Sequence, residues 1–234
     1  MTANDIVAEL KKFANAQTKK TWMNHGAQEP CLGVKIEDMK KIQKRVKMDY
    51  QLGLDLYDTG IADAMYLAGL IADDAKMTRK DLQKWIEAAN SPWVAEYSVP
   101  WVASGSPHGR VLAVKWMESK DETIAAAGWQ TYSSMVAIKE DVDLDLAEIK
   151  SLLQRVAKSI HQQPNRVKYV MNSFVIAVAC HVKPLHKFAV DTAKDIGPVA
   201  VDLVGACTIP FAPDRIKKFK ARSAIGKKRK SAKC

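Results

Sequence analysis

Apolar residues recur every three or four positions along most of this chain, and that spacing is typical of amphipathic α-helices. Near the start, Ile6, Leu10 and Phe13 share one helical face, and Asn4 or Asp5 can cap the helix. Thr78 followed by Asp81 resembles a capping box at the start of another helix. The chain is expected to be all-α, with further helices over Ile36–Val46, Leu52–Tyr57, Ala62–Asp73, Arg79–Ala89, Trp93–Ser104, His108–Ser119, Glu122–Ala137, Asp145–His161, Asn165–Val182, Leu185–Ile196 and Arg215–Arg222.

Some of these helices are apolar on nearly every side, which is typical of burial. Amphipathic and apolar helices alternate along the chain and are separated by short turns. This pattern predicts a HEAT-like repeat α-α superhelix, a solenoid of antiparallel helix pairs whose inner helices line a concave face. An irregular helical bundle is the alternative. The expected inner helices are Ala62–Asp73, Val111–Met117, Ile124–Ala137 and Val167–Val182.

Positive charge is concentrated at the C-terminal end. The chain has 36 Lys and Arg against 26 Asp and Glu, and Arg215–Cys234 holds ten of the basic residues and no acid. The predicted organisation is a helical domain over residues 1–213, with Gly197–Pro213 irregular, and a basic tail over 214–234, for which the sequence leaves both an ordered and a loose end open. Such a tail can neutralise phosphates and make binding salt-dependent. A solvated tail that aids solubility is the alternative, and docking on an anionic membrane is a weaker one, since no lipidation motif accompanies the charge.

Composition argues against several other classes of protein. Hydrophobic residues make up 47% of the chain, too many for a disordered one, and no apolar run is long enough to span a bilayer. No signal-peptide core follows the first residues, so a cytoplasmic location, with an activity at the bacterial nucleoid, is expected. Cysteines that are far apart argue against a disulfide framework or zinc ribbon and predict free thiols; they are Cys31, Cys180, Cys207 and Cys234.

Several segments resemble the AlkD-like DNA alkylation repair family, as a divergent subgroup. No single motif is specific, so the resemblance depends on the order and spacing of the segments. It covers roughly residues 1–195. The tail after Gly197 is similar to that of a subgroup. The segments are Gly33-Val34-Lys35-Ile36 with Asp38–Ile42, the helix Asp63–Asp73, Asn90-Ser91-Pro92-Trp93, Trp116 with Ala125–Trp129, and Asn165–Pro184.

The resemblance implies a HEAT-like repeat fold with a positively charged concave surface that binds double-stranded DNA. Members of the family are DNA glycosylases that excise purines alkylated at position 3 or 7 without flipping the base, unlike base-flipping enzymes. Two tryptophans and an aspartate approach the deoxyribose, and the carboxylate stabilises the positive charge that develops on the sugar. No metal or organic cofactor is implied. The expected partner of a monomeric chain is alkylated double-stranded DNA.

The candidate catalytic residues follow from the family motif. Trp93 matches its first tryptophan, but the aspartate position one helical turn later holds Tyr97. Glu96 supplies a carboxylate one residue earlier, which points about 100° away around an α-helix. The second tryptophan position falls at Phe174, and the family's arginine falls at about Ala125. A neutral tyrosine cannot offset a cation well, so excision depends on Glu96 turning towards the DNA.

Other residues are candidates for nucleic-acid binding. Trp93 and Trp101 are eight positions apart and can flank a groove, although tryptophans at apolar positions (Trp85, Trp101, Trp116, Trp129) more often belong to the core. Asn165 and Arg166 can bind phosphate at a helix N-terminus, or Asn165 can cap that helix. Cys180, His181 and His186 are not expected to hold a metal, because Pro184 interrupts their helix. The candidates for nucleic-acid binding are Lys35, Trp101, Arg110, Asn165, Arg166, Lys168, Asn172, Lys227, Lys228, Arg229 and Lys230.

Three hypotheses follow from these patterns. The first is a glycosylase for alkylated purines, which depends on the family resemblance, Trp93 and a nearby acid. The second is a non-catalytic DNA-binding HEAT module, which depends on Tyr97, Phe174 and Ala125 at the family's functional positions. The third is a protein-binding scaffold, since many helical solenoids bind proteins, and the basic tail argues mildly against it.

Overall fold

The computed structural model describes residues 1–202 and 208–233, and the regular structure in these ranges consists of helices. The all-α prediction is therefore confirmed. The chain divides into two compact units, Met1–His108 with Lys233, and Gly109–Ala232. The predicted irregular segment Gly197–Pro213 lies partly outside the described residues, as do Cys207 and Cys234.

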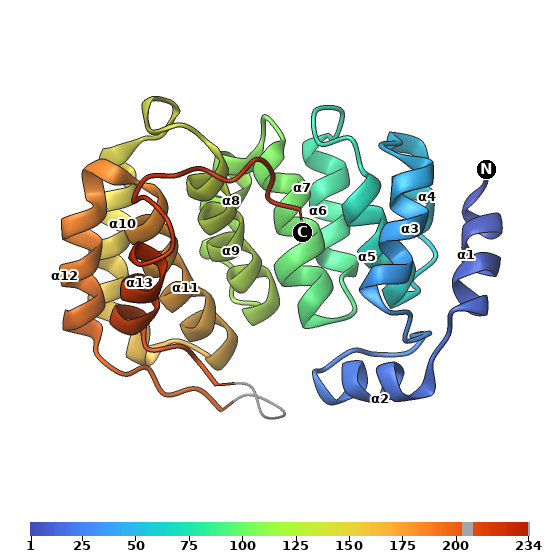
Figure 1. Ribbon diagram of the computed structural model, residues 1–234, viewed down its shortest axis with the longest axis horizontal. Coiled ribbons are helices and arrows are strands. Elements are labelled where there is room, and N and C mark those ends of the chain that lie inside the picture. Colours follow the sequence, from blue (N-terminus) through green and yellow to red (C-terminus); the bar gives the residue numbers. More distant parts are fainter. Residues whose placement is uncertain (203–207, 234) are drawn as a thin grey trace. The chain divides into compact units, whose positions relative to one another are not determined.

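The first unit places one fully buried helix among partly exposed ones. All residues of α5 (Ala62–Ile71) are buried, which confirms the prediction of an inner helix. It packs against α3 (Ile36–Val46) and α4 (Tyr50–Tyr57), as consecutive helices of a hairpin do. The other helical segments of this unit are α1 (Ala3–Lys12), α2 (Ala16–Asn24), α6 (Arg79–Ala88), the π-helical turn η1 (Val94–Ser98) and α7 (Val99–Gly105) (Figure 1).

Local capping positions several of these helices. The predicted capping box of α6 is present: the Asp81 N–H donates to Thr78 Oγ1 at 3.1 Å, and the Thr78 N–H donates to Asp81 Oδ2 at 2.9 Å. The N-cap of α1 is Thr2, so the predicted cap at Asn4 or Asp5 is wrong. Asp5 completes a second capping box by accepting the Thr2 N–H at 2.8 Å.

Helix α2 was not predicted. It contains no fully buried residue, so no apolar stripe marks it in the sequence. Asn15 caps it by accepting a hydrogen bond from the Thr18 N–H at 2.8 Å.

The second unit is centred on α9 (Glu122–Ile138) and α11 (Asn165–His181). These helices pack against each other, and α9 also packs closely on α8 (Gly109–Met117) (Figure 1). Trp116 and Trp129 are buried here, and Trp85 is buried in the first unit. The other segments are η2 (Asp141–Asp143), α10 (Leu146–Ser159), η3 (Ile160–Gln162), η4 (Lys183–Leu185), α12 (His186–Ile196) and α13 (Ala212–Lys220).

The C-terminal end is part of the second unit. Helix α13 packs on α11 and α12, so the predicted boundary at residues 213/214 falls inside a packed helix. The sequence leaves open whether the last residues are ordered; the Gly226 N–H donates to Cys180 O at 2.9 Å and the Arg229 N–H donates to Ala137 O at 2.7 Å, so this part of the tail is held on the second unit. Among the described helices, none alone is long and apolar enough to cross a membrane. The bent pair Asn165–His181 and Lys183–Ile196 meets that test only by length and composition.

Candidate nucleic-acid interface

Five side chains form a connected aromatic cluster in the first unit. Ring centroids are 4.0 Å apart for Trp22 and Trp93, and 5.3 Å apart for Trp93 and Tyr66. Tyr66 continues to Trp101 at 5.4 Å, and Trp101 to Tyr97 at 5.9 Å. Trp93 and Trp101 thus flank Tyr66. The predicted contact of Trp101 with nucleic acid finds little support, because only 6% of this residue is exposed; Tyr97, at 38%, is the most exposed ring of the cluster, and Trp22 and Trp93 are partly exposed.

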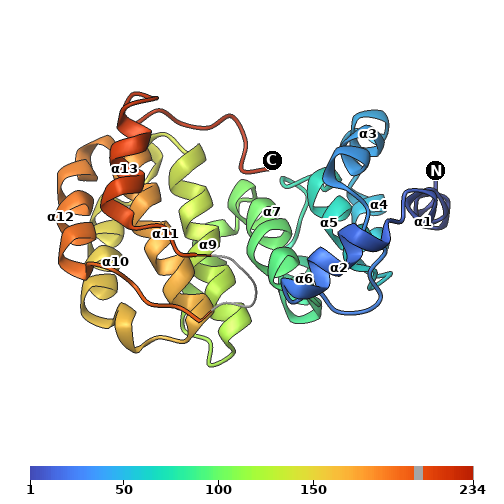
Figure 2. The ribbon, with the colours of Figure 1, turned by 60° about the horizontal axis from the view of Figure 1, so that its bottom comes forward.

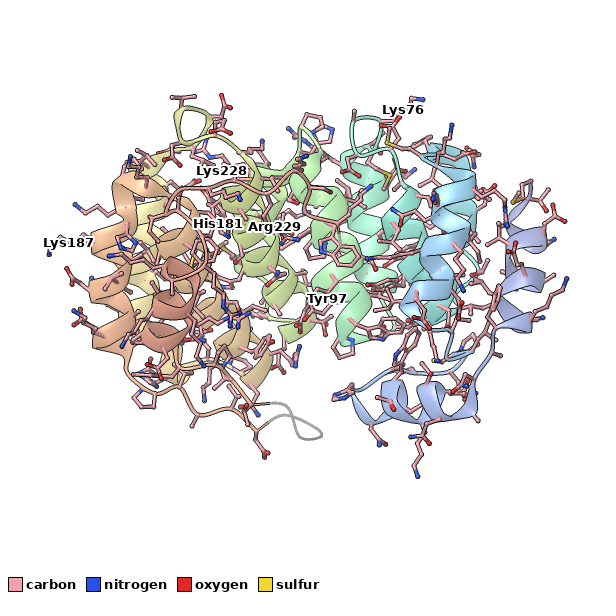
Figure 3. The ribbon with its side chains drawn as sticks, in the orientation of Figure 1. Lys76, Tyr97, His181, Lys187, Lys228 and Arg229 are labelled. Carbon is pink, nitrogen blue, oxygen red and sulfur yellow. The ribbon has the colours of Figure 1, made fainter. Side chains whose placement is uncertain are left out.

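A π-helical turn decides which side chain is exposed at the family's acid position. The Val99 N–H bonds to Val94 O, five residues back, where the sequence predicts one continuous α-helix over Trp93–Ser104. In this turn Glu96 is 3% exposed while Tyr97 faces solvent (Figure 3). The prediction that Glu96 and Tyr97 point about 100° apart around an α-helix is therefore corrected. The two residues lie in a π-turn, which buries the Glu96 side chain and exposes that of Tyr97. Such π-turns occur frequently at functional sites.

Pro100 gives the physical reason for the π-turn. It has no N–H to bond to Glu96 O, and its ring would clash with that carbonyl in an α-helix. Close packing constrains the same turn, because a Cβ at Gly69 of α5 would lie 2.7 Å from Ser98 Cβ. Pro100 was therefore the sequence feature that could have revealed this turn.

The segment between α2 and α3 packs beside Trp22 and Trp93. Gly33, with φ of +75°, fits against the start of α2, where a Cβ would lie 2.4 Å from Lys19 N. Gly26, at the end of α2, approaches Pro92 so closely that a Cβ would be 3.1 Å from its ring. Both glycines permit contacts that a larger residue would prevent.

Asp63 anchors this segment from the first turn of α5. Its two carboxylate oxygens accept the Leu32 N–H at 2.6 Å and the Val34 N–H at 2.7 Å. The residue is fully buried, and burial raises the pKa of its carboxyl, although these hydrogen bonds oppose the shift. Asp63 therefore serves the fold, and sequence reasoning gave it no such role.

The two described cysteines are free, as predicted. Burial raises the pKa of the Cys31 thiol to about 11 and that of Cys180 also to about 11. Both are therefore protonated at neutral pH and are poor nucleophiles.

The second unit does not present the predicted second aromatic of the site. Phe174 has no exposed surface and packs on Trp129 and Tyr132, with centroids 5.3 and 5.9 Å away. The role of Phe174 at the sugar is therefore corrected to a core role. Ala125, where the family's arginine was expected, is also buried.

Arg110 is held by acidic residues and is not free for a phosphate. Its Nη2 lies 2.8 Å from Asp145 Oδ2 and its Nε lies 2.9 Å from Glu148 Oε2, while the Tyr132 hydroxyl also donates to Glu148. Burial raises the pKa of Glu148, but the bonds from Arg110 and Tyr132 outweigh it and hold that pKa below its usual 4.5. These ion pairs give Arg110 a structural role, and its predicted contact with nucleic acid would require them to break.

We expect Arg110→Gln to lower the free energy of unfolding by about 1–2 kcal/mol at pH 7, a value reduced for the exposure of Arg110. The stabilisation is present above pH 4.5 and is lost as pH falls through the lowered native pKa of Glu148. Urea unfolding at pH 7 and pH 3.5 measures this difference. Lys158→Gln, which removes a charge from the exposed side of α10, should change stability by less than about 0.5 kcal/mol. Equal losses in the two variants would contradict the assignment.

The start of α11 is occupied by the protein's own groups. The N-cap is Pro164, so the alternative that Asn165 caps the helix is wrong; the Asn165 side chain donates to Asp202 O at 3.0 Å. The Arg166 N–H donates to Glu122 Oε1 at 2.6 Å, which fills the predicted phosphate site. Asn172 is 1% exposed and donates to Pro210 O at 3.0 Å, so its predicted contact with nucleic acid is corrected as well.

The predicted basic contacts differ in their environments. Lys35 is exposed, and its Nζ lies 3.8 Å from Glu37 Oε1. Lys168 is half-buried. Lys227, Arg229 and Lys230 are exposed. Lys228 is not, since its side chain is 8% exposed and its Nζ lies 2.8 Å from Asp141 Oδ1.

Comparison with known proteins gives consistent results. A family model described as DNA alkylation repair enzyme matches residues 6–226. The uncharacterized protein Lin0241 of Listeria innocua is 30% identical over 228 residues, which are 95% of this chain and 99% of that protein. The uncharacterized protein Lmo0209 of Listeria monocytogenes is 30% identical over 229 residues, with the same two shares.

A solved structure is similar over the whole of both chains, with a TM-score of 0.92 and 35% sequence identity. It is described as a new family of proteins related to the HEAT-like repeat DNA glycosylases, with affinity for branched DNA structures. This likeness confirms the HEAT-like fold. With the match to the family model, it shows that the chain belongs to the DNA alkylation repair family.

Proposed function

We propose that this chain is a DNA-binding protein with affinity for branched DNA, and that it does not excise alkylated bases. The observation that carries the proposal is the arrangement at the aromatic cluster. Tyr97 is exposed there, while the neighbouring carboxylate of Glu96 is buried. The cluster therefore offers a neutral ring to a nucleic acid in the place where excision needs a negative charge.

The chemistry of excision explains why an exposed tyrosine in place of a carboxylate matters. Breaking an N-glycosidic bond places positive charge on the sugar, and a fixed carboxylate beside the sugar lowers that barrier. A phenol offers a ring face and a hydroxyl but no fixed negative charge. Base excision with Glu96 as the acid is the second candidate function, and it requires that side chain to leave its buried position.

The DNA-binding part of the proposal is supported by the relatives. The similar solved structure belongs to proteins with affinity for branched DNA, and it covers the full length of this chain. An exposed aromatic ring suits unpaired or unstacked bases, which are found at junctions, because stacking on a ring does not depend on sequence.

A binding and excision experiment tests both parts. We expect a labelled three-way junction to shift in an electrophoretic mobility assay at lower protein concentrations than a linear duplex of equal length. A duplex with one 7-methylguanine should lose that base no faster than without protein, measured by cleavage at the abasic site.

A known alkylpurine glycosylase serves as the positive control for excision. Release of 7-methylguanine by the wild-type chain that Glu96→Gln abolishes would contradict the non-catalytic assignment. Absence of binding to both DNAs in dilute buffer would contradict the DNA-binding function.

A further inference from the structure

We propose that the segment 215–230 is an ordered phosphate-binding surface, and that Lys228 is the internal anchor that sets its geometry. This inference rests on the proposed DNA binding. Within 215–230, the cations that face solvent have no ion pair with a carboxylate among the described residues, and we call them the C-terminal basic surface. They are Arg215, Lys217, Lys218, Lys220, Arg222, Lys227, Arg229 and Lys230.

Helix α13 orients the first part of this surface. Ala212 and Ile216 are buried, and Phe219 packs on the core of the second unit. Because one face of the helix is fixed by these apolar contacts, its lysines and arginines must point into solvent. Figure 2 shows α13 in red beside α11 and α12, with which it makes its contacts.

Lys228 differs from its charged neighbours in facing inward. Its Nζ lies 3.0 Å from Val136 O and 2.8 Å from Asp141 Oδ1. It thus bonds to a free carbonyl in the last turn of α9 and to a carboxylate in the turn that follows. A cation at a helix C-terminus also interacts favourably with the helix dipole.

Backbone bonds on both sides fix the segment around Lys228. The Gly226 N–H caps α11 at Cys180 O, and the Arg229 N–H caps α9 at Ala137 O. The chain therefore completes the hydrogen bonding of two helix ends that would otherwise have unpaired carbonyls. Because residues 226, 228 and 229 are held in this way, the side chains of Lys227, Arg229 and Lys230 already point into solvent before any DNA binds.

His181 joins the two parts of the surface. Its ring lies 5.1 Å from that of Phe219 in α13, and its Nδ1 is 2.7 Å from Lys227 O (Figure 3). Burial lowers the pKa of His181; the hydrogen bond to Lys227 O opposes this shift, and the nearby charges of Lys228 and Arg229 add to it, so the neutral ring is favoured. A neutral ring tolerates the surrounding cations, which a charged one would repel.

The chemistry of the surface favours a nucleic-acid backbone as its partner. Its eight exposed groups are cations, whereas Ile216 is buried and Phe219 is half-buried, so Phe211 at the N-cap of α13 is the exposed aromatic ring beside them and gives a membrane little apolar area to bind. A row of fixed cations matches a row of phosphates and releases counterions when it binds them. The match to the family model ends at residue 226, before Lys227–Lys230.

Two adjacent lysines provide the test. Lys227→Met and Lys228→Met remove the same charge, but the first removes a phosphate contact and the second removes the anchor. We measure the affinity for a labelled three-way junction by fluorescence anisotropy between 50 and 300 mM salt. Lys227→Met should reduce the slope of log K against log salt by about 0.9 and weaken binding roughly five- to tenfold at 0.1 M salt.

Lys228→Met should behave differently. We expect an unchanged slope with an affinity about three- to tenfold lower, because the released segment must be ordered on binding. Trypsin should also cleave at Lys227–Lys230 faster than in the wild-type protein. Lys228→Arg, which keeps a cation that can donate to Val136 O and Asp141, should keep protection close to that of the wild type. Lys187→Met, which removes a charge from α12, should bind like the wild type (Figure 3).

The outcomes separate the inference from the proposed function. If the wild-type protein binds the junction but both lysine variants reduce the slope equally, Lys228 is a phosphate contact and the anchor assignment is wrong. If neither variant changes affinity, the surface is not used for DNA, although the proposed function stands. If the wild-type protein binds phosphatidylserine vesicles and no DNA, both are wrong.

Discussion

Asp63→Ala is expected to lower the free energy of unfolding of the first unit by about 3–5 kcal/mol. The substitution leaves two backbone N–H groups, those of Leu32 and Val34, without their acceptors in a buried site. Each unsatisfied buried donor costs about 1–3 kcal/mol, and the lost side chain leaves a cavity as well. The segment that carries Gly33 should loosen, and the contact between Trp22 and Trp93 should weaken with it.

Urea unfolding followed by tryptophan fluorescence measures this loss. Asp63→Asn keeps the volume and one acceptor, so its loss should be about half as large. The exposed Asp55→Ala is the control and should change stability by less than about 0.5 kcal/mol. An equal effect of Asp63→Ala and Asp55→Ala would show that the two hydrogen bonds do not hold the segment.

The pH dependence of Asp63 has a definite sign. Burial holds the native pKa of Asp63 above the usual 3.8, which applies to the unfolded chain. At a pH between the unfolded and the native pKa, unfolding therefore releases a proton from this carboxyl. This group therefore lowers stability as pH rises through that interval. Asp63→Asn should remove this slope, which unfolding experiments between pH 3.5 and 6 can measure.

Gly128→Ala is expected to destabilise the second unit by about 3 kcal/mol. A Cβ at this position of α9 would lie 2.5 Å from Met117 N and 2.7 Å from Ala113 O, both backbone atoms of α8. Backbone cannot move aside as a flexible side chain can, so the two helices would have to separate. The buried contacts of the neighbouring Trp116 and Trp129 would be weakened with them.

Gly53→Ala is a matched control with the opposite expected sign. Its Cβ would be 3.4 Å from Ala72 Cα, an ordinary contact, and alanine favours a helix by about 0.5–1 kcal/mol over glycine. Thermal unfolding of both variants gives the comparison. A stable Gly128→Ala protein would show that α8 and α9 tolerate a wider separation than the structure has.

The sequence by itself determined most of the helices and their inner faces, because both depend on contacts between residues three or four positions apart. The apolar composition of α5 predicted its complete burial, and Thr78 with Asp81 predicted the start of α6. Family resemblance added the HEAT-like fold. Helix α2 was missed because its stability depends on packing with distant residues, and it has no buried stripe of its own.

Only the tertiary structure decided what each candidate site residue touches. Phe174, Arg110 and Lys228 have the side chains that a DNA site requires, but partners distant in sequence bury the first and pair the other two. Lys227 and Lys228 cannot be told apart by type or by neighbours in the sequence. The ends of α9 and α11 distinguish them, because the carbonyls and the carboxylate that bind Lys228 come together only when these helices pack.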